Sequence, residues 1–118
     1  MKLLVVDDNK SITNTLLKYL KANGHDVRCC NDGYEGLALI QNEKWDKILL
    51  DLSMPEFSGL DIIESLEKDG IMKDKKIIIF TAASISDYII EKLKTKEGVH
   101  GLLKKPLSLV HLTEALTA

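Results

Sequence analysis

Three short apolar runs, each ending at a polar residue, constrain the fold of this chain more than any other feature. The runs occupy residues 2–6, 47–50 and 76–80, and the polar residues after them are Asp7, Asp51 and Thr81. Uninterrupted apolar runs of this length favour strands that are buried on both faces, as in a parallel sheet. A carboxylate at the end of such a strand is costly unless a partner compensates its charge. Asp51 is therefore a candidate for chemistry as well as for a simple capping or turn residue.

Segments with helical periodicity separate these runs and complete an alternating pattern. Apolar residues recur at spacings of three and four, and glycine follows the first, third and fourth segments, as a helix end favours. We expect helices at 10–23, 33–42, 59–69, 87–97 and 108–116, and two further strands at 26–30 and 101–103. Five strands that alternate with five helices predict an α/β fold, a doubly wound (βα)5 parallel sheet with helices on both faces.

Polar residues that follow four of the strands indicate where the chemistry lies. In sheets of this kind, ligands bind beyond the carboxyl ends of the strands, where the strand order reverses. The residues at these ends are Asp7, Asp8, Asp51, Thr81 and Lys105. We therefore expect these five side chains to converge at one edge of the sheet.

The grouped carboxylates favour a hard divalent cation. Three ionised carboxylates in a partly dry cleft repel one another unless a cation neutralises them. Mg²⁺ prefers oxygen ligands and shares its shell with water and phosphate, and Mn²⁺ is an acceptable substitute. The three aspartates would supply carboxylate oxygens, and a backbone carbonyl near Ser53 would supply another. With a lysine as a fixed positive charge and a threonine hydroxyl as a donor, the set suits phosphoryl transfer.

Composition and charge narrow the range of partners. The net charge is -2 and no basic run is present, which argues against direct binding of nucleic acid. No stretch approaches the roughly 20 apolar residues that a membrane span needs, and no signal-peptide pattern precedes the first strand. We therefore expect a cytoplasmic protein without membrane insertion. Cys29 and Cys30 would point to opposite faces of a strand, so they are expected to be reduced rather than paired.

Five motifs along the chain resemble those of the receiver domain of response regulators, the phospho-accepting half of two-component signalling. They are VVDDN at 5–9, LLDLSMP at 49–55, Gly59, IFTA at 79–82 and KKP at 104–106. Each motif alone is weak, whereas the five together, in the family's order and approximate spacing, are highly specific. The resemblance implies one receiver domain over residues 1–118, with the flavodoxin-like strand order 2-1-3-4-5.

The resemblance also implies a role for each residue around the predicted acidic cluster. Asp51 is expected to accept a phosphoryl group from a sensor histidine kinase or a histidine phosphotransfer protein in a reaction that depends on Mg²⁺. Asp8 is expected to bind the ion directly, Asp7 mainly through water, and Ser53 through its carbonyl. Such a domain phosphorylates and dephosphorylates itself but is not a turnover enzyme for an outside substrate.

The same resemblance predicts which residues bind the phosphoryl group and which surface responds to it. Thr81 and Lys105 are expected to bind the phosphoryl oxygens, and the bond before Pro106 is expected to be cis. Phosphorylation would shift the face formed by the fourth helix, the fifth strand and the fifth helix, which would bind an unidentified protein target or support a phospho-dependent dimer. Leu102 replaces the aromatic residue usual in the family, which disfavours an aromatic switch. Activation would then run through Thr81 and the following loop alone, or be weaker. Ser53 and Ala83 stand where the family tunes access of the hydrolytic water.

Two other classes of protein share this architecture. A Mg²⁺-dependent phosphatase of the haloacid dehalogenase type also uses a strand-end aspartate, but it wants a second aspartate where this chain has Ser53. A flavodoxin-like protein that binds FMN needs hydroxyl and glycine donors after the first strand, where Asp7 and Asp8 would repel the phosphate. No output segment follows the last predicted helix, so we expect either a stand-alone receiver or a receiver taken from a longer regulator.

Overall fold

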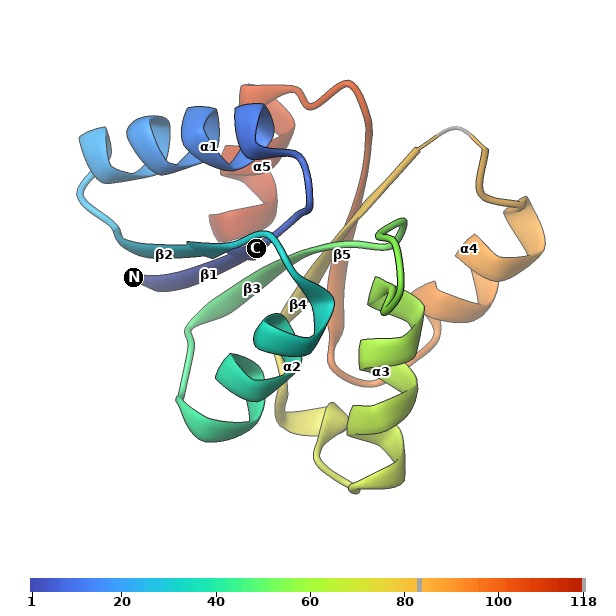
Figure 1. Cartoon of the computed structure of the whole chain (residues 1–118). Coiled ribbons are helices and arrows are strands. Elements are labelled where there is room, and N and C mark those ends of the chain that lie inside the picture. The colour runs from blue at the N-terminus through green and yellow to red at the C-terminus, as the bar shows by residue number, and fades with distance from the viewer. Residues whose placement is uncertain (83, 118) are drawn as a thin grey trace.

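A five-stranded parallel sheet forms the centre of the molecule (Figure 1). The computed structural model describes residues 1–82 and 84–117. The strands are β1 (Lys2–Val6), β2 (Asp26–Cys30), β3 (Lys47–Asp51), β4 (Ile77–Thr81) and β5 (Val99–Lys104). They lie in the order β2-β1-β3-β4-β5, so the predicted fold class and strand order are confirmed.

Helices cover both faces of this sheet. They are α1 (Lys10–Ala22), α2 (Gly33–Asn42), α3 (Gly59–Lys68), α4 (Asp87–Lys94) and α5 (Leu109–Thr117). Figure 1 shows α1 and α5 on one face and α2 and α3 on the other, with α4 beside them. Each face therefore has its own apolar core between the sheet and its helices.

The central strands supply side chains to both cores. Leu49 of β3 packs into the core under α1 and α5, whereas its neighbours Ile48 and Leu50 pack into the core under α2 and α3. This alternation follows from the pleat of a strand, which points successive side chains to opposite faces. All three residues are almost completely buried, and such burial stabilises by about 1.5–3 kcal/mol per side chain. The apolar run thus fixes where β3 ends, and Asp51 lies at that end.

Side-chain caps start the helices directly after the strand ends. The Asn9 side chain accepts hydrogen bonds from the backbone N–H groups of Ser11 and Ile12 at 2.9 and 3.3 Å, so α1 begins just beyond the end of β1. Ser58 and Asp61 form a reciprocal capping box at the start of α3. Caps of this kind satisfy the N–H groups that a helix start leaves open. They fix the loops that carry the polar residues of the sheet edge.

The region of α4 and β5 differs from the predicted boundaries. Helix α4 ends at Lys94 rather than near Glu97, and β5 is longer at both ends than the predicted 101–103. Gly98 has a φ of +93°, and a Cβ there would clash with the Met72 carbonyl oxygen, so the chain must turn at this glycine. Residues 72–74 form a short 3₁₀ helix that the sequence analysis did not predict.

Candidate functional site

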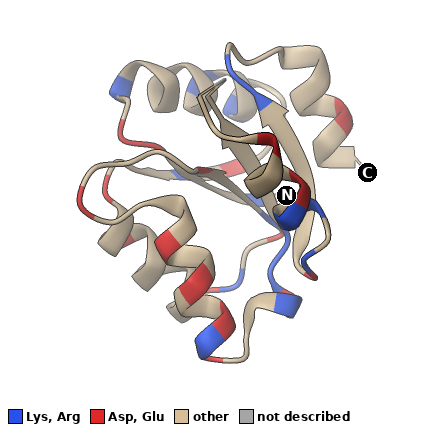
Figure 2. Cartoon of the chain, turned by 90° about the vertical axis from the view of Figure 1, so that its right-hand side faces the viewer, with Lys and Arg blue, Asp and Glu red and all other residues tan. Residues whose placement is uncertain are grey.

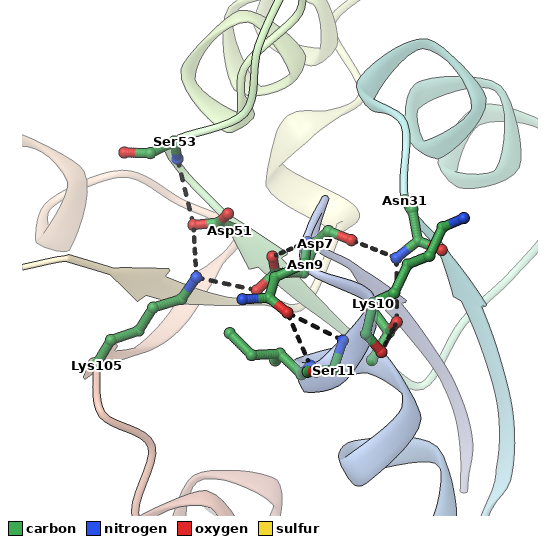
Figure 3. A network of polar contacts seen from close by, with 10 residues as sticks. Asp7, Asn9, Lys10, Ser11, Asn31, Asp51, Ser53 and Lys105 are labelled. Atoms are coloured by element: carbon green, nitrogen blue, oxygen red, sulfur yellow. Dashed lines mark hydrogen bonds and ion pairs between the residues drawn. The ribbon is translucent and has the colours of Figure 1, made fainter.

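The carboxyl ends of β1, β3 and β5 bring three aspartates and a lysine together. Figure 3 shows the lysine, Lys105, with two of them, Asp7 and Asp51. One carboxylate oxygen from each of Asp7, Asp8 and Asp51 lies within 4.8 Å of the others. Asp7 is fully buried and Asp51 is 1% exposed, whereas Asp8 is exposed. The cluster is therefore closed on the side of the sheet and open to solvent on the side of Asp8.

Lys105 neutralises part of this negative charge. Its Nζ lies 3.0 Å from Asp7 Oδ2 and 3.4 Å from Asp51 Oδ1 (Figure 3). The backbone N–H of Lys105 donates to the Thr81 carbonyl at 2.9 Å, which anchors the residue to the end of β4. The bond between Lys105 and Pro106 is cis, as the resemblance implied. Lys105 therefore bridges the two buried carboxylates.

The two buried carboxylates have different hydrogen-bond partners. Asp7 Oδ1 accepts from the Asn9 backbone N–H at 2.9 Å, and Asp51 Oδ1 accepts from the Ser53 N–H at 3.3 Å. Among the described residues, no group donates a hydrogen bond to the buried Oδ2 of Asp51. Asp7 Oδ2 also lacks a hydrogen bond of good geometry there but is close to the Lys105 ammonium. A buried polar atom without a partner is unusual and needs an explanation.

The pKa values reflect this burial and crowding. Burial, followed by the nearby charge of Asp7, raises the pKa of Asp51 from 3.8 to about 6, although Lys105 and the Ser53 N–H oppose the rise. Burial alone would lower the pKa of Lys105, but its contacts with Asp7 and Asp51 outweigh burial and raise it. Asp51 is therefore mostly ionised at neutral pH, at a cost to the stability of the fold.

This cost predicts that the wild type and an Asp51→Asn variant differ in stability by an amount that depends on pH. An acid whose pKa is raised by folding stabilises the fold below its unfolded pKa, and this contribution is lost as the pH rises through the folded value. For Asp51 that window runs from 3.8 to about 6. The stability of Asp51→Asn minus that of the wild type should therefore be larger above this window than at pH 4, by about 1–3 kcal/mol. Urea unfolding in EDTA between pH 4 and 7.5 measures the difference.

An exposed acid outside the cluster provides the control for this measurement. Asp69 follows α3, far along the chain from the cluster, and Asp69→Asn should follow the wild-type pH profile. Parallel profiles for Asp51→Asn and the wild type would show that Asp51 carries no such cost.

The donor set fits a hard divalent cation. The oxygens of the three aspartates are close enough to share one ion, and oxygen ligands are those that Mg²⁺ prefers. The unpartnered Oδ2 of Asp51 is explained if a cation or an incoming group occupies the space in front of it. Ser53 belongs to the loop after β3, and its backbone N–H fastens that loop to Asp51.

Thr81 lies at the same edge but is not hydrogen-bonded to the cluster. Its side chain is fully buried, and its hydroxyl donates to the Ala82 carbonyl at 3.1 Å. Leu102, on β5, is half-buried and packs against the core under α2 and α3. Ala83, where the family tunes access of water, lies outside the described residues.

The sequence analysis missed Asn31, which belongs to this network. It follows β2, and its side-chain amide donates to the Asp7 carbonyl at 2.7 Å and to the Thr13 hydroxyl at 3.0 Å (Figure 3). Asn31 thereby fastens the end of β1 to the end of β2 and to α1. The rule that polar residues gather beyond strand ends applies to β2 as well, so that rule could have found it.

Comparison of the sequence with known proteins points to a single family. The sequence model of the family described as "Response regulator receiver domain" matches residues 3–117. The curated response regulator MprA of Mycobacterium sp. (strain KMS) is 33% identical over 100% of this chain, and the MprA of Mycobacterium leprae is 31% identical. The chain covers 50% of the length of each of these relatives.

Solved structures of receiver domains have the same fold. The receiver domain of Francisella response regulator 1452 has a TM-score of 0.84 and 33% identity, covering 98% of this chain and 93% of that one. The Vibrio cholerae chemotaxis protein CheY4 has a TM-score of 0.83 and 28% identity, covering 98% and 95%. The likeness therefore extends over almost the whole chain in both sequence and structure.

Proposed function

Because the chain belongs to the response regulator receiver domain family of two-component signalling, we propose that residues 1–118 form one receiver domain and that phosphorylation of Asp51 switches it. This family membership favours the receiver over a phosphatase or a flavodoxin-like protein with a related sheet. The domain modifies itself and does not turn over an outside substrate.

The observation that carries the proposal is the environment of Asp51. A buried carboxylate with one unpartnered oxygen lies beside a lysine and two further carboxylates. A residue that only capped a turn would not need a second acid and a cation at this distance. Its pKa of about 6 leaves the carboxylate mostly ionised at neutral pH, as a nucleophile requires.

The geometry around Asp51 supports the following group transfer. An oxygen of Asp51 attacks the phosphorus of a phosphohistidine, the new O–P bond forms, and the P–N bond to the imidazole breaks. The electron pair of that bond leaves with the imidazole nitrogen. Lys105 faces Asp51 and so meets the negative oxygens of the incoming group, which is the positive charge that phosphoryl transfer uses. In the reverse direction of the switch, water attacks the phosphorus, the O–P bond to Asp51 breaks, and inorganic phosphate leaves, so that Asp51 is again a free carboxylate.

Asp7, Asp8, Asp51 and the Ser53 carbonyl are the groups that would hold Mg²⁺ or Mn²⁺. The bound ion supplies positive charge that lets the carboxylates and a phosphoryl group share one small space. Asp7 keeps its own geometry through Asn9 and Asn31, so it is already oriented without an ion.

The switch is proposed to begin at Thr81. Its hydroxyl now bonds to the neighbouring Ala82 carbonyl, and a phosphoryl oxygen would be a stronger, charged acceptor for it. Turning toward that oxygen would move the loop after β4 and, with it, α4. The face of α4, β5 and α5 would then bind a protein target or a second copy. Leu102 lacks the aromatic ring that many relatives carry, so Thr81 and its loop carry the switch.

The partners are proposed to be proteins. A histidine kinase or a histidine phosphotransfer protein supplies the phosphoryl group, and an effector protein binds the face of α4, β5 and α5 after it has shifted. Figure 2 looks onto the side that carries α4, where basic and acidic segments are interspersed, which favours a protein over nucleic acid. Among the described residues, no helix is both long and apolar enough to cross a bilayer. The free thiols of Cys29 and Cys30 suit a reducing cytoplasm.

Intact-mass spectrometry after incubation with acetyl phosphate tests the proposal. The wild type should gain one phosphoryl group in the presence of Mg²⁺ and none in EDTA. Asp51→Asn should gain none under either condition, because it has no nucleophilic oxygen at this position. A phosphorylated histidine phosphotransfer protein serves as a second donor in the same assay.

The Asp69→Asn variant is the matched control, since it removes an exposed carboxylate outside the cluster. It should take up one phosphoryl group like the wild type. The proposal is wrong if Asp51→Asn takes up the group with the same stoichiometry, or if the wild type takes up none from either donor.

A further inference from the structure

The loop after Asp51 contains a strained turn. The N–H of Phe57 donates to the Pro55 carbonyl at 2.7 Å, which closes a three-residue turn around Glu56. Glu56 has a φ of +66°, the one positive value for a residue other than glycine among the described residues. Three-residue turns with this sign of φ are rare and strained, and they persist where the surrounding structure holds them.

A stacked aromatic pair holds this turn against α2. The rings of Tyr34 and Phe57 lie with their centroids 4.5 Å apart and their planes 20° from parallel. Beside them, the backbone of Gly33 approaches Phe57 so closely that a Cβ on Gly33 would clash with the Phe57 carbonyl oxygen. Tyr34 is nevertheless 57% exposed, so its ring is not a core residue that the fold needs for burial.

The other attachments of this pair lead back to the acidic cluster. Asp32 caps α2 by accepting from the Tyr34 N–H at 2.6 Å, which fixes the start of the helix. One turn later, Gly36 lies against Val6, the residue before Asp7, since a Cβ there would be 2.8 Å from the Val6 side chain. The start of α2 is thus fixed to the end of β1. The stack joins the loop that carries Ser53 to the strand end that carries Asp7.

We propose that Tyr34 is a positioning residue of the metal site. By stacking on Phe57 it keeps the strained loop in place, so that the Ser53 carbonyl and Asp51 face Asp7 and Asp8 before an ion binds. This inference rests on the proposed function, because it assigns a role in the binding of Mg²⁺. Without the stack the strained turn relaxes, and binding of the ion must then also order the loop.

Titration calorimetry with MgCl₂ at pH 7.5 tests this role. Tyr34→Ala should raise the dissociation constant for Mg²⁺ by about three- to tenfold, the range that a lost aromatic pair allows. Tyr34→Phe keeps the ring and removes the hydroxyl, so it should bind like the wild type. Phe57→Ala should weaken binding as Tyr34→Ala does. The double variant should be no weaker than either single variant, because both remove the same contact.

The rate of phosphoryl uptake provides a second readout. Tyr34→Ala should raise the Mg²⁺ concentration that gives half of the maximal rate with acetyl phosphate by the same factor. Its rate at saturating Mg²⁺ should stay within about twofold of the wild type, because Tyr34 touches none of the reacting atoms. A fall in the saturating rate without a change in the half-maximal concentration would overturn the assignment.

Tyr19→Ala is the control for general loss of stability. Tyr19 packs into the core under α1 and α5 and bonds to the Thr113 hydroxyl, on the other face of the sheet. Its removal should lower the stability of the fold and leave the dissociation constant for Mg²⁺ unchanged. The inference is overturned if Tyr34→Ala binds like the wild type, or if Tyr19→Ala weakens binding as much. Absence of Mg²⁺ binding in the wild type would overturn the proposed function as well.

Discussion

A Gly59→Ala variant is expected to lose about 2–3 kcal/mol of stability, near the upper end of the usual cost of overpacking. A Cβ on Gly59 would clash with the Asp51 carbonyl oxygen and would lie 2.8 Å from the Leu52 Cα. Both neighbours are backbone atoms, and the Gly59 N–H also donates to the Leu52 carbonyl at 3.1 Å. The new methyl group can be accommodated only if the start of α3 moves away from the end of β3.

This variant also tests how rigidly Asp51 is held. Because the displaced atoms belong to Asp51 and Leu52, phosphoryl uptake should slow along with the loss of stability, which urea unfolding measures. Gly101→Ala is the matched control, since its Cβ would meet the Ile78 side chain at an ordinary 3.7 Å. It should stay within about 0.5 kcal/mol of the wild type. Equal stabilities of Gly59→Ala and Gly101→Ala would show that α3 is not fixed to the strand end.

Replacing Lys105 by methionine is expected to have the other large effect. The variant leaves Asp7 and Asp51 buried side by side without their cation, and removal of one partner from a buried ion pair typically costs about 3–5 kcal/mol. In EDTA at pH 7.5 the variant should therefore unfold at a clearly lower urea concentration than the wild type. The loss should shrink as the pH falls toward the raised pKa of Asp51, about 6, because protonation of Asp51 removes its repulsion with Asp7.

The response to Mg²⁺ separates charge from packing in this variant. The added ion should recover more stability in Lys105→Met than in the wild type, since it compensates a larger uncancelled negative charge. Phosphoryl uptake should nevertheless be slower by about tenfold or more, because no ammonium faces the incoming oxygens. Lys104→Met, at an exposed neighbouring position, is the control and should change neither property. A variant that Mg²⁺ stabilises no more than the wild type would contradict the proposed neutralising role of Lys105.

The parts of the fold that rest on burial could be predicted from the sequence. The runs that became β1, β3 and β4 are apolar because both faces of each strand are covered, and this signal is hard to mistake. β5 is half-exposed at the edge of the sheet, so its signal is weaker and its length was underestimated. The end of α4 was misplaced because Gly98 turns against a distant segment, the Met72 carbonyl, and local patterns do not report such contacts.

The candidate site likewise contains contacts that the sequence predicts and contacts that it does not. Asp7, Asp51 and Lys105 meet because parallel strands end at one edge, a consequence of topology that periodicity alone reveals. The contact between Tyr34 and Phe57 depends instead on how the start of α2 meets the loop before α3. Neither ring stands out in the sequence, and only three-dimensional packing brings them together. The strain at Glu56 likewise has no local signature, since the residue is an ordinary glutamate.

The bridge that Lys105 makes has a consequence for the order of synthesis. A growing chain exposes Asp7 first and Asp51 later, and both precede Lys105, which directly follows the last strand, β5. Until that strand emerges from the ribosome and pairs with β4, the ammonium of Lys105 cannot be held between the two acids. The bridge through Lys105 therefore joins the strand ends made first and last, and it can form only once the whole sheet is available.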